Sequence, residues 1–198
     1  MRTIEWNERA VRATVTVVAQ VSPGDLSRPT PCAEWDLAAL LAHMTAQHRG
    51  FAAAAAGRGA DPEAWEPGPP EPDPVAAYAA AAEAVISAFA APGVLGRDFH
   101  MPELGPRAIP GHLAVGFHFV DYLVHGWDVA AAIGLAYEPD ADLVAAALPI
   151  VEAVPDDESR LAPGAPFGPA LPDPGTGAFD RLLALVGRRR TESVGPRG

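Results

Sequence analysis

Apolar residues recur every three or four positions over much of the chain, which is the spacing of an amphipathic α-helix. In the first such stretch, at about residues 3–20, the apolar positions are Ile4, Val11, Val15 and Val18. Later stretches predict helices at about 37–56, 74–91, 111–133, 141–153 and 179–186. No segment shows the alternation of apolar and polar residues that is typical of a strand. We therefore expect an all-α protein, with a bundle of four main helices followed by short C-terminal helices.

Residues that favour helix ends lie beside several of these stretches. Asp36 is placed to cap the second helix, Pro74 follows Asp73 as the first residue of the third, and Gly134 ends the fourth. Two long loops rich in proline and glycine, at 57–74 and 92–110, connect the main helices. Connections of this length allow a topology other than a simple up-down-up-down bundle.

The predicted fourth helix carries a narrow polar stripe on an otherwise apolar surface. Its members are His118, Asp121, His125 and Asp128. At about 100° per residue these four positions fall within an arc of roughly 80°. The stripe indicates either a slim solvent-exposed face or a buried polar site.

Composition narrows the classes of partner. The chain has 198 residues, a formal net charge of -11 and no lysine, which argues against binding to nucleic acid or to an anionic membrane surface. We expect one domain over residues 1–190, with the chain fraying from Arg188 and a disordered tail at 191–198. No signal peptide and no apolar run of about 20 residues is present, so we expect a cytoplasmic protein.

Asp121 and His125 are the clearest candidates for chemistry, because side chains four residues apart on a helix share a face and can bind one ion. A third ligand would have to come from another helix. The candidates are His43 and His48 on the second helix, with His100 and His112 as less favoured alternatives, and the pattern alone does not choose among them. A single histidine on an apolar helix face is more often a hydrogen-bonded core residue than a ligand.

Other residues offer weaker signals. Cys32 is the single cysteine, and with no base beside it in the sequence we expect a packed thiol rather than a nucleophile. Trp65 either anchors the first long loop to the body or lines the rim of a pocket. Polar residues of the second long loop are candidate substrate contacts, although solvation is the simpler interpretation; they are Arg97, His100, Glu103 and Arg107.

Three segments carry a resemblance to a known family. They are Pro31-Cys-Ala-Glu-Trp-Asp-Leu-Ala-Ala-Leu-Leu-Ala-His43, Val120-Asp-Tyr-Leu-Val-His-Gly-Trp-Asp-Val-Ala130 and Phe179-Asp-Arg-Leu-Leu-Ala-Leu-Val-Gly187. In this order, over nearly the whole chain, they resemble the DinB-like superfamily, in the branch related to mycothiol-dependent maleylpyruvate isomerase. The resemblance implies a four-helix bundle that binds a divalent metal ion. Carried over residue by residue, it implies His43, Asp121 and His125 as the ligands, and leaves His48 with a core or pocket-lining role.

This chain departs from the isomerase pattern at one ligand. The resembled isomerase has glutamate at the position of Asp121, and some relatives have histidine. Aspartate is one methylene shorter than glutamate, so the metal position in this chain would differ from that in the isomerase. Two nitrogens and one carboxylate with open positions suit Zn²⁺, with Ni²⁺, Fe²⁺ and Mn²⁺ as alternatives. His118 is a possible fourth ligand, a proton carrier or an exposed residue. Asp128 either orients the His125 ring from outside the ligand set or makes a local contact.

The function that the resemblance implies is metal-dependent activation of a low-molecular-weight thiol such as mycothiol. The thiol would be transferred to a small electrophilic substrate, or would assist its isomerisation, in a transferase or isomerase. One alternative is a non-catalytic bundle that binds a metal or a small ligand. Another is a bundle that serves partner interaction, with a solvated polar stripe. The oligomeric state is open between monomer and homodimer.

Overall fold

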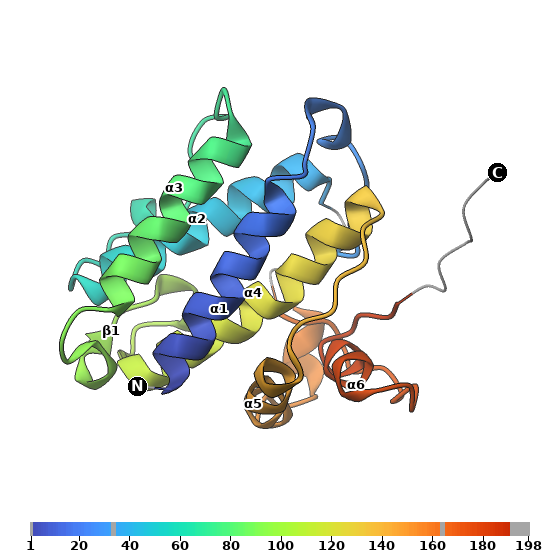
Figure 1. Ribbon diagram of the computed structural model, residues 1–198. Coiled ribbons are helices and arrows are strands. Elements are labelled where there is room, and N and C mark those ends of the chain that lie inside the picture. Colours follow the sequence, from blue (N-terminus) through green and yellow to red (C-terminus); the bar gives the residue numbers. More distant parts are fainter. Residues whose placement is uncertain (1, 33–34, 163–164, 191–198) are drawn as a thin grey trace. The chain divides into compact units, whose positions relative to one another are not determined.

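The computed structural model describes residues 2–32, 35–162 and 165–190, and within them the chain is mostly helical (Figure 1). The helices are α1 (Arg2–Val18), α2 (Leu37–Ala55), α3 (Pro74–Phe89), α4 (Gly111–Ile133), α5 (Ala141–Glu152) and α6 (Ala178–Leu185). Each lies close to its predicted range, so the all-α prediction is confirmed. The tail predicted at 191–198 lies outside the described residues.

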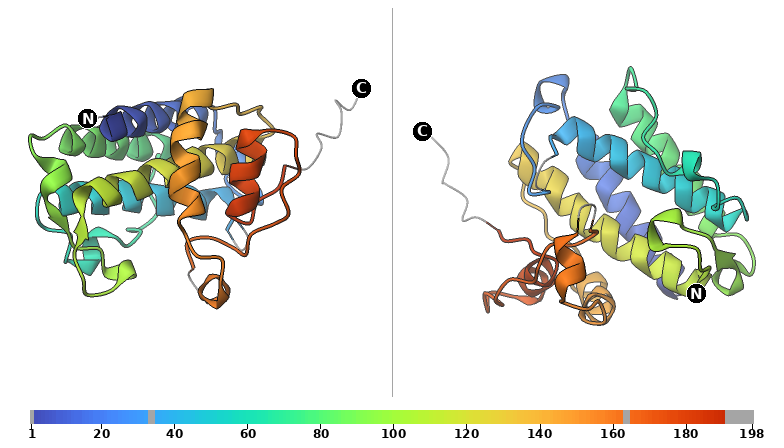
Figure 2. Two further views of the ribbon diagram at one scale, coloured as in Figure 1. Left: turned by 90° about the horizontal axis from the view of Figure 1, so that it is seen from below. Right: turned by 180° about the vertical axis from the view of Figure 1, so that it is seen from behind.

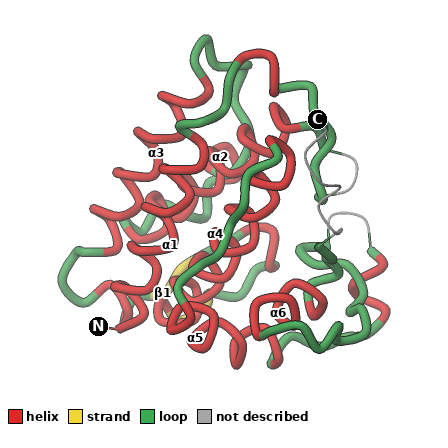
Figure 3. The backbone as a smooth tube through the Cα atoms, turned by 45° about the vertical axis from the view of Figure 1, so that its right-hand side comes forward, coloured by secondary structure: helices red, strands yellow, loops and turns green. Residues whose placement is uncertain are grey.

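One short β-ribbon was not predicted. β1 (Asp98–Phe99) pairs antiparallel with β2 (Ile109–Pro110) inside the second long loop, and it is a small part of the described backbone (Figure 3). Two residues per strand are too few to produce an alternating sequence pattern. Among the described residues, no helix is both long enough and apolar enough to cross a membrane.

The chain divides into two compact units, Met1–Tyr137 and Glu138–Gly198. The first contains α1 to α4, and the second contains α5 and α6. Within the second unit, the buried Arg160 donates hydrogen bonds to four backbone carbonyl oxygens, at 2.6–3.2 Å. These contacts hold the proline-rich segment that precedes α6, since the acceptors belong to Val154, Pro155, Gly168 and Leu185. The single domain expected over 1–190 stays a prediction.

In the first unit, the order of the helices around the bundle differs from their order in the sequence. α1 packs mainly along α4 and also along α3, whereas α2 packs mainly along α3 and also along α4 (Figure 1 and Figure 2). α1 and α2 therefore lie diagonally across the bundle from each other. Connecting two diagonal helices requires a long loop. The shared core includes Val11, Leu41, Tyr78, Tyr122 and Val129.

The predicted helix ends follow from local hydrogen bonds. The Asp36 carboxylate accepts a bond of 2.9 Å from the backbone N–H of Ala39, so it caps α2 as predicted. Asp73 caps α3 in the same way at 2.9 Å. Gly134 ends α4 with a φ of 74°, a left-handed conformation that glycine adopts without a steric cost.

Trp65 anchors the first long loop to the bundle. Its side chain is buried against Phe51 of α2, with the ring centroids 5.2 Å apart, and its indole N–H donates to the backbone oxygen of Gly59 at 2.9 Å. The indole also lies directly over Gly50, where a β-carbon would overlap the ring. The glycine at position 50 thus permits the close approach of the loop to α2.

Gly50→Ala should lower the free energy of unfolding by about 1–3 kcal/mol, because the added methyl group displaces the Trp65 ring from α2. This value is the net effect, in which the steric cost outweighs the gain of about 1 kcal/mol that alanine brings to a helix interior. Gly68→Ala is the control, since a β-carbon there meets no atom within 4 Å. Urea unfolding followed by circular dichroism measures both variants. Equal stability of the two would contradict the proposed role of Gly50.

Candidate metal centre

Three of the sequence-predicted residues meet between α2 and α4. His43 comes from α2, and Asp121 and His125 come from successive turns of α4. One potential ligand atom from each lies within 4.8 Å of the others. The His125 Nε2 and Asp121 Oδ1 atoms are 3.3 Å apart, and the His43 and His125 ring centroids are 5.6 Å apart.

The spacing of these atoms fits a divalent ion. A tetrahedral Zn²⁺ with bond lengths of about 2.0–2.1 Å keeps two of its ligand atoms roughly 3.3–3.4 Å apart, as Nε2 of His125 and Oδ1 of Asp121 are. Two imidazole nitrogens and one carboxylate oxygen form a donor set that leaves a coordination position open. The Asp121 side chain is 27% exposed, so a small molecule has access to this side of the site.

Charges inside the site favour a bound cation. Burial opposes protonation of His125, but attraction to Asp121, together with hydrogen bonds to Asp121 and Asp128, raises its pKa to about 9. Burial alone would raise the pKa of Asp121, yet the neighbouring His125 lowers it to about 2. Burial lowers the pKa of His43 to about 4, so this ring is neutral at pH 7 and keeps a free lone pair. The site thus places two carboxylates around His125.

Asp128 contacts the candidate ligand His125 directly. Its fully buried carboxylate lies 2.8 Å from Nδ1 of His125, while Nε2 of the same ring faces Asp121. A carboxylate on the far nitrogen fixes both the tautomer and the orientation of a ligand imidazole. Of the two interpretations of Asp128, the structure therefore favours the one in which it orients His125.

The structure places His118 away from the ligand set. The residue is fully buried, so the interpretation as an exposed side chain is wrong. Its Nδ1 lies 2.6 Å from Nδ2 of Asn7, and its Nε2 lies 3.1 Å from Nδ1 of His48. Both ring nitrogens therefore have protein partners. His48 is buried in the core, as the resemblance implied, whereas His100 and His112 are exposed.

Cys32 lies closer to titratable side chains than its neighbours in the sequence indicate. Its sulfur, a ring nitrogen of His125 and a carboxylate oxygen of Asp128 lie within 4.8 Å of one another. No base lies beside Cys32 in the sequence, but the loop before α2 brings the thiol near His125 and Asp128 of α4. The packed thiol stays a prediction. The 2.8 Å contact between His125 and Asp128 has the length of a hydrogen bond and is shorter than the roughly 3.3 Å that separates two ligand atoms of a tetrahedral Zn²⁺. This second group is therefore a poorer metal site than the first.

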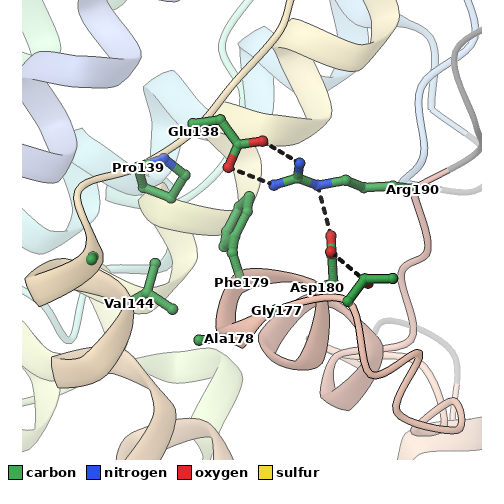
Figure 4. A pocket seen from close by; sticks show the side chains of 10 residues that line it. Glu138, Pro139, Val144, Gly177, Ala178, Phe179, Asp180 and Arg190 are labelled. Atoms are coloured by element: carbon green, nitrogen blue, oxygen red, sulfur yellow. Dashed lines mark hydrogen bonds and ion pairs between the residues drawn. The ribbon is translucent and has the colours of Figure 1, made fainter.

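A separate pocket of about 360 Å³ lies within the second unit (Figure 4). Arg190 projects into it, forms an ion pair with Glu138, lies 2.9 Å from Asp180 and stacks over the Phe179 ring at 4.9 Å. Because Arg190 is held by these contacts and Arg188 is buried, fraying does not start at Arg188 as predicted. Glu138 and Asp180 neutralise the charge of the Arg190 guanidinium. No motif in the sequence had indicated this pocket.

Comparisons with known proteins identify a matching family and two relatives. The family described as "Mycothiol maleylpyruvate isomerase N-terminal domain" matches residues 8–130, which span all three candidate ligands. Two uncharacterized proteins from two strains of Mycobacterium tuberculosis are each 35% identical over 188 residues, covering 92% of this chain and 95% of theirs. No solved structure matches this chain.

Asp128→Asn should lower the pKa of His125 in chelator-treated protein, because it removes a negative charge 2.8 Å from Nδ1. A pKa of about 9 in the wild type means that His125 contributes stability in full below pH 6.5 and loses it as the pH rises through 9. In the variant, the contribution should be smaller and should be lost completely at a lower pH. An NMR titration of the ring protons measures the change, with the exposed Asp98→Asn as control. An unchanged pKa in Asp128→Asn would refute the assigned contact.

Proposed function

Because this chain belongs to the mycothiol maleylpyruvate isomerase N-terminal domain family, part of the DinB-like superfamily, we propose that it is a divalent-metal-dependent enzyme acting with a low-molecular-weight thiol. The observation that carries this proposal is the meeting of His43, Asp121 and His125, with potential ligand atoms within 4.8 Å of one another. These are also the residues that the family resemblance assigns as ligands.

The proposed ligands differ in what they contribute. His43 and His125 would supply imidazole nitrogens, and Asp121 would supply a carboxylate oxygen. Zn²⁺ suits this mixed set best, with Ni²⁺, Fe²⁺ and Mn²⁺ as alternatives. When bound, such an ion lowers the pKa of a coordinated thiol, so that the sulfur is a nucleophile near neutral pH.

The remaining residues of the site would hold this set in place. Asp128 keeps Nε2 of His125 turned towards Asp121. The indole of Trp35 packs against the His43 ring at a centroid distance of 4.5 Å, which limits rotation of that side chain. The partial exposure of Asp121 gives the thiol and the second substrate a path to the open position.

We propose mycothiol or a close analogue as the thiol, and a small electrophilic molecule as the substrate, with transfer or isomerisation as the outcome. The family description supports the thiol, and the partly exposed ligand set supports a small substrate. A cytoplasmic location fits a thiol-dependent reaction, since a reducing compartment keeps thiols free.

Protein purified without an affinity tag under metal-replete conditions should contain about one divalent ion per chain. His125→Ala should lose the ion, because it removes a ligand nitrogen and frees the Asp128 carboxylate that oriented it. His112→Ala, at an exposed position on the same helix, is the matched control and should retain the ion. Elemental analysis by mass spectrometry gives the stoichiometry. A value near zero in the wild type would rule out both the enzyme and a metal-binding protein.

The metal-loaded protein should consume an electrophilic substrate only when mycothiol is present, and a chelator should abolish the reaction. The assay follows loss of substrate by chromatography over a panel of electrophiles that includes maleylpyruvate. Asp121→Ala should lose activity together with the metal, whereas Asp121→Glu keeps a carboxylate and should retain metal binding. Metal binding without consumption of any electrophile would favour the alternative of a non-catalytic binding protein.

A further inference from the structure

The candidate site is divided between two helix pairs. α1 packs most extensively with α4, and α2 with α3, so the direct interface between α2 and α4 is comparatively small. Yet His43 lies on α2, whereas Asp121 and His125 lie on α4. The three side chains can meet only if the two pairs are aligned correctly along and around their axes.

A buried chain of polar side chains joins the two pairs. Asn7 of α1 contacts His118 of α4, and His118 contacts His48 of α2, with atom separations of 2.6 Å and 3.1 Å. All three residues are at most 1% exposed. The chain therefore runs through the bundle interior and crosses from one helix pair to the other.

The hydrogen bonds in this chain have a defined direction. With Nδ2 of Asn7 as the donor, Nδ1 of His118 accepts, and the His118 proton must lie on Nε2. That proton is then donated to Nδ1 of His48. Burial lowers the pKa of both rings, that of His118 to about 3, so each ring is neutral and offers one donor and one acceptor.

Tyr122 provides a second link beside the ligands. Its ring stacks on His48 and on His118, with centroid distances of 3.9 Å and 4.2 Å. Its hydroxyl donates to the backbone oxygen of Met44. Because Met44 follows His43 and Tyr122 follows Asp121, this side-chain-to-backbone bond links α4 to α2 beside the ligand positions.

We propose that Asn7, His118 and His48 are positioning residues that set the rotation of α4 against α1 and α2, and so bring Asp121 and His125 opposite His43. The inference rests on the proposed metal site. A shift of one residue along α4 would rotate its side chains by about 100° and leave the imidazoles without partners in the core. An apolar core of equal volume could fill the same space without selecting this rotation.

Replacing the chain by apolar residues tests the proposal. In the triple variant Asn7→Leu, His48→Phe and His118→Phe, no polar group of the chain is left unpaired, so the bundle should still fold. We expect its affinity for Co²⁺, the probe ion, to fall by about 10- to 100-fold, the usual effect of removing groups that support metal ligands. The visible absorption spectrum of bound Co²⁺ should also change.

His48→Asn is the conservative control, because its amide oxygen is attached to Cγ as Nδ1 is and can still accept the His118 proton. It should bind Co²⁺ with nearly wild-type affinity. If the triple variant does not fold, His48→Phe alone is measured in the same way. A folded apolar variant with the affinity and spectrum of the wild type would overturn the proposal.

A metal-independent measurement separates this inference from the proposed function. In chelator-treated wild type, the rings of His43 and His125, whose centroids are 5.6 Å apart, should give a nuclear Overhauser effect. The triple variant should lose that signal, and its persistence there would contradict the positioning role. If the wild type binds no Co²⁺, the proposed function fails, and this ring-to-ring signal still decides the positioning role.

Discussion

The arrangement of the first unit depends on polar side chains that are buried between helices. α4 is buried along most of its length, and still carries His118, Asp121, His125 and Asp128. A buried polar group without a partner costs free energy, whereas a buried group with a partner constrains the geometry of both. On α4 these partners come from α1, α2 and α4 itself, so satisfying them fixes how the helices meet.

The same constraint divides the polar stripe of α4 into two parts with different chemistry. His118 has both ring nitrogens occupied by Asn7 and His48, and burial keeps it neutral. His125, two turns further along, has a carboxylate at each nitrogen, and the same degree of burial is outweighed by their charge. One helix face thus contains a neutral hydrogen-bonded network and a site with excess negative charge, the second of which suits a cation.

The sequence was sufficient for the helices and for part of the site. Periodicity located α1 to α6, and Asp36 and Gly134 marked helix ends through local hydrogen bonding, which depends on near neighbours. The spacing of Asp121 and His125 placed them on one face for the same reason. The choice of His43 over His48 required the family resemblance, because both lie on α2 and only the packing of α2 against α4 distinguishes them.

Residues in irregular segments were harder to interpret. The approach of Cys32 to His125 and Asp128 depends on the path of a loop, which has no periodic signal. The contact of Arg190 with Glu138 joins residues 52 positions apart in the sequence. The role of His118 was also hidden, because the position of a residue on a helix face does not reveal whether its partner is a metal, water or another side chain.

The aspartate at position 121 is consistent with the close approach of α2 and α4. A carboxylate one methylene shorter than glutamate keeps its oxygen nearer the α4 backbone, so a shared ion would also lie nearer to α4. His43 must then reach further across from α2, which is possible only where the two helices are held together. The bond from Tyr122 to the Met44 backbone and the packing of Trp35 on His43 provide that closeness. The length of the ligand and the spacing of the helices are therefore linked, so a longer carboxylate at position 121 would move a bound ion away from α4 without removing its ligands.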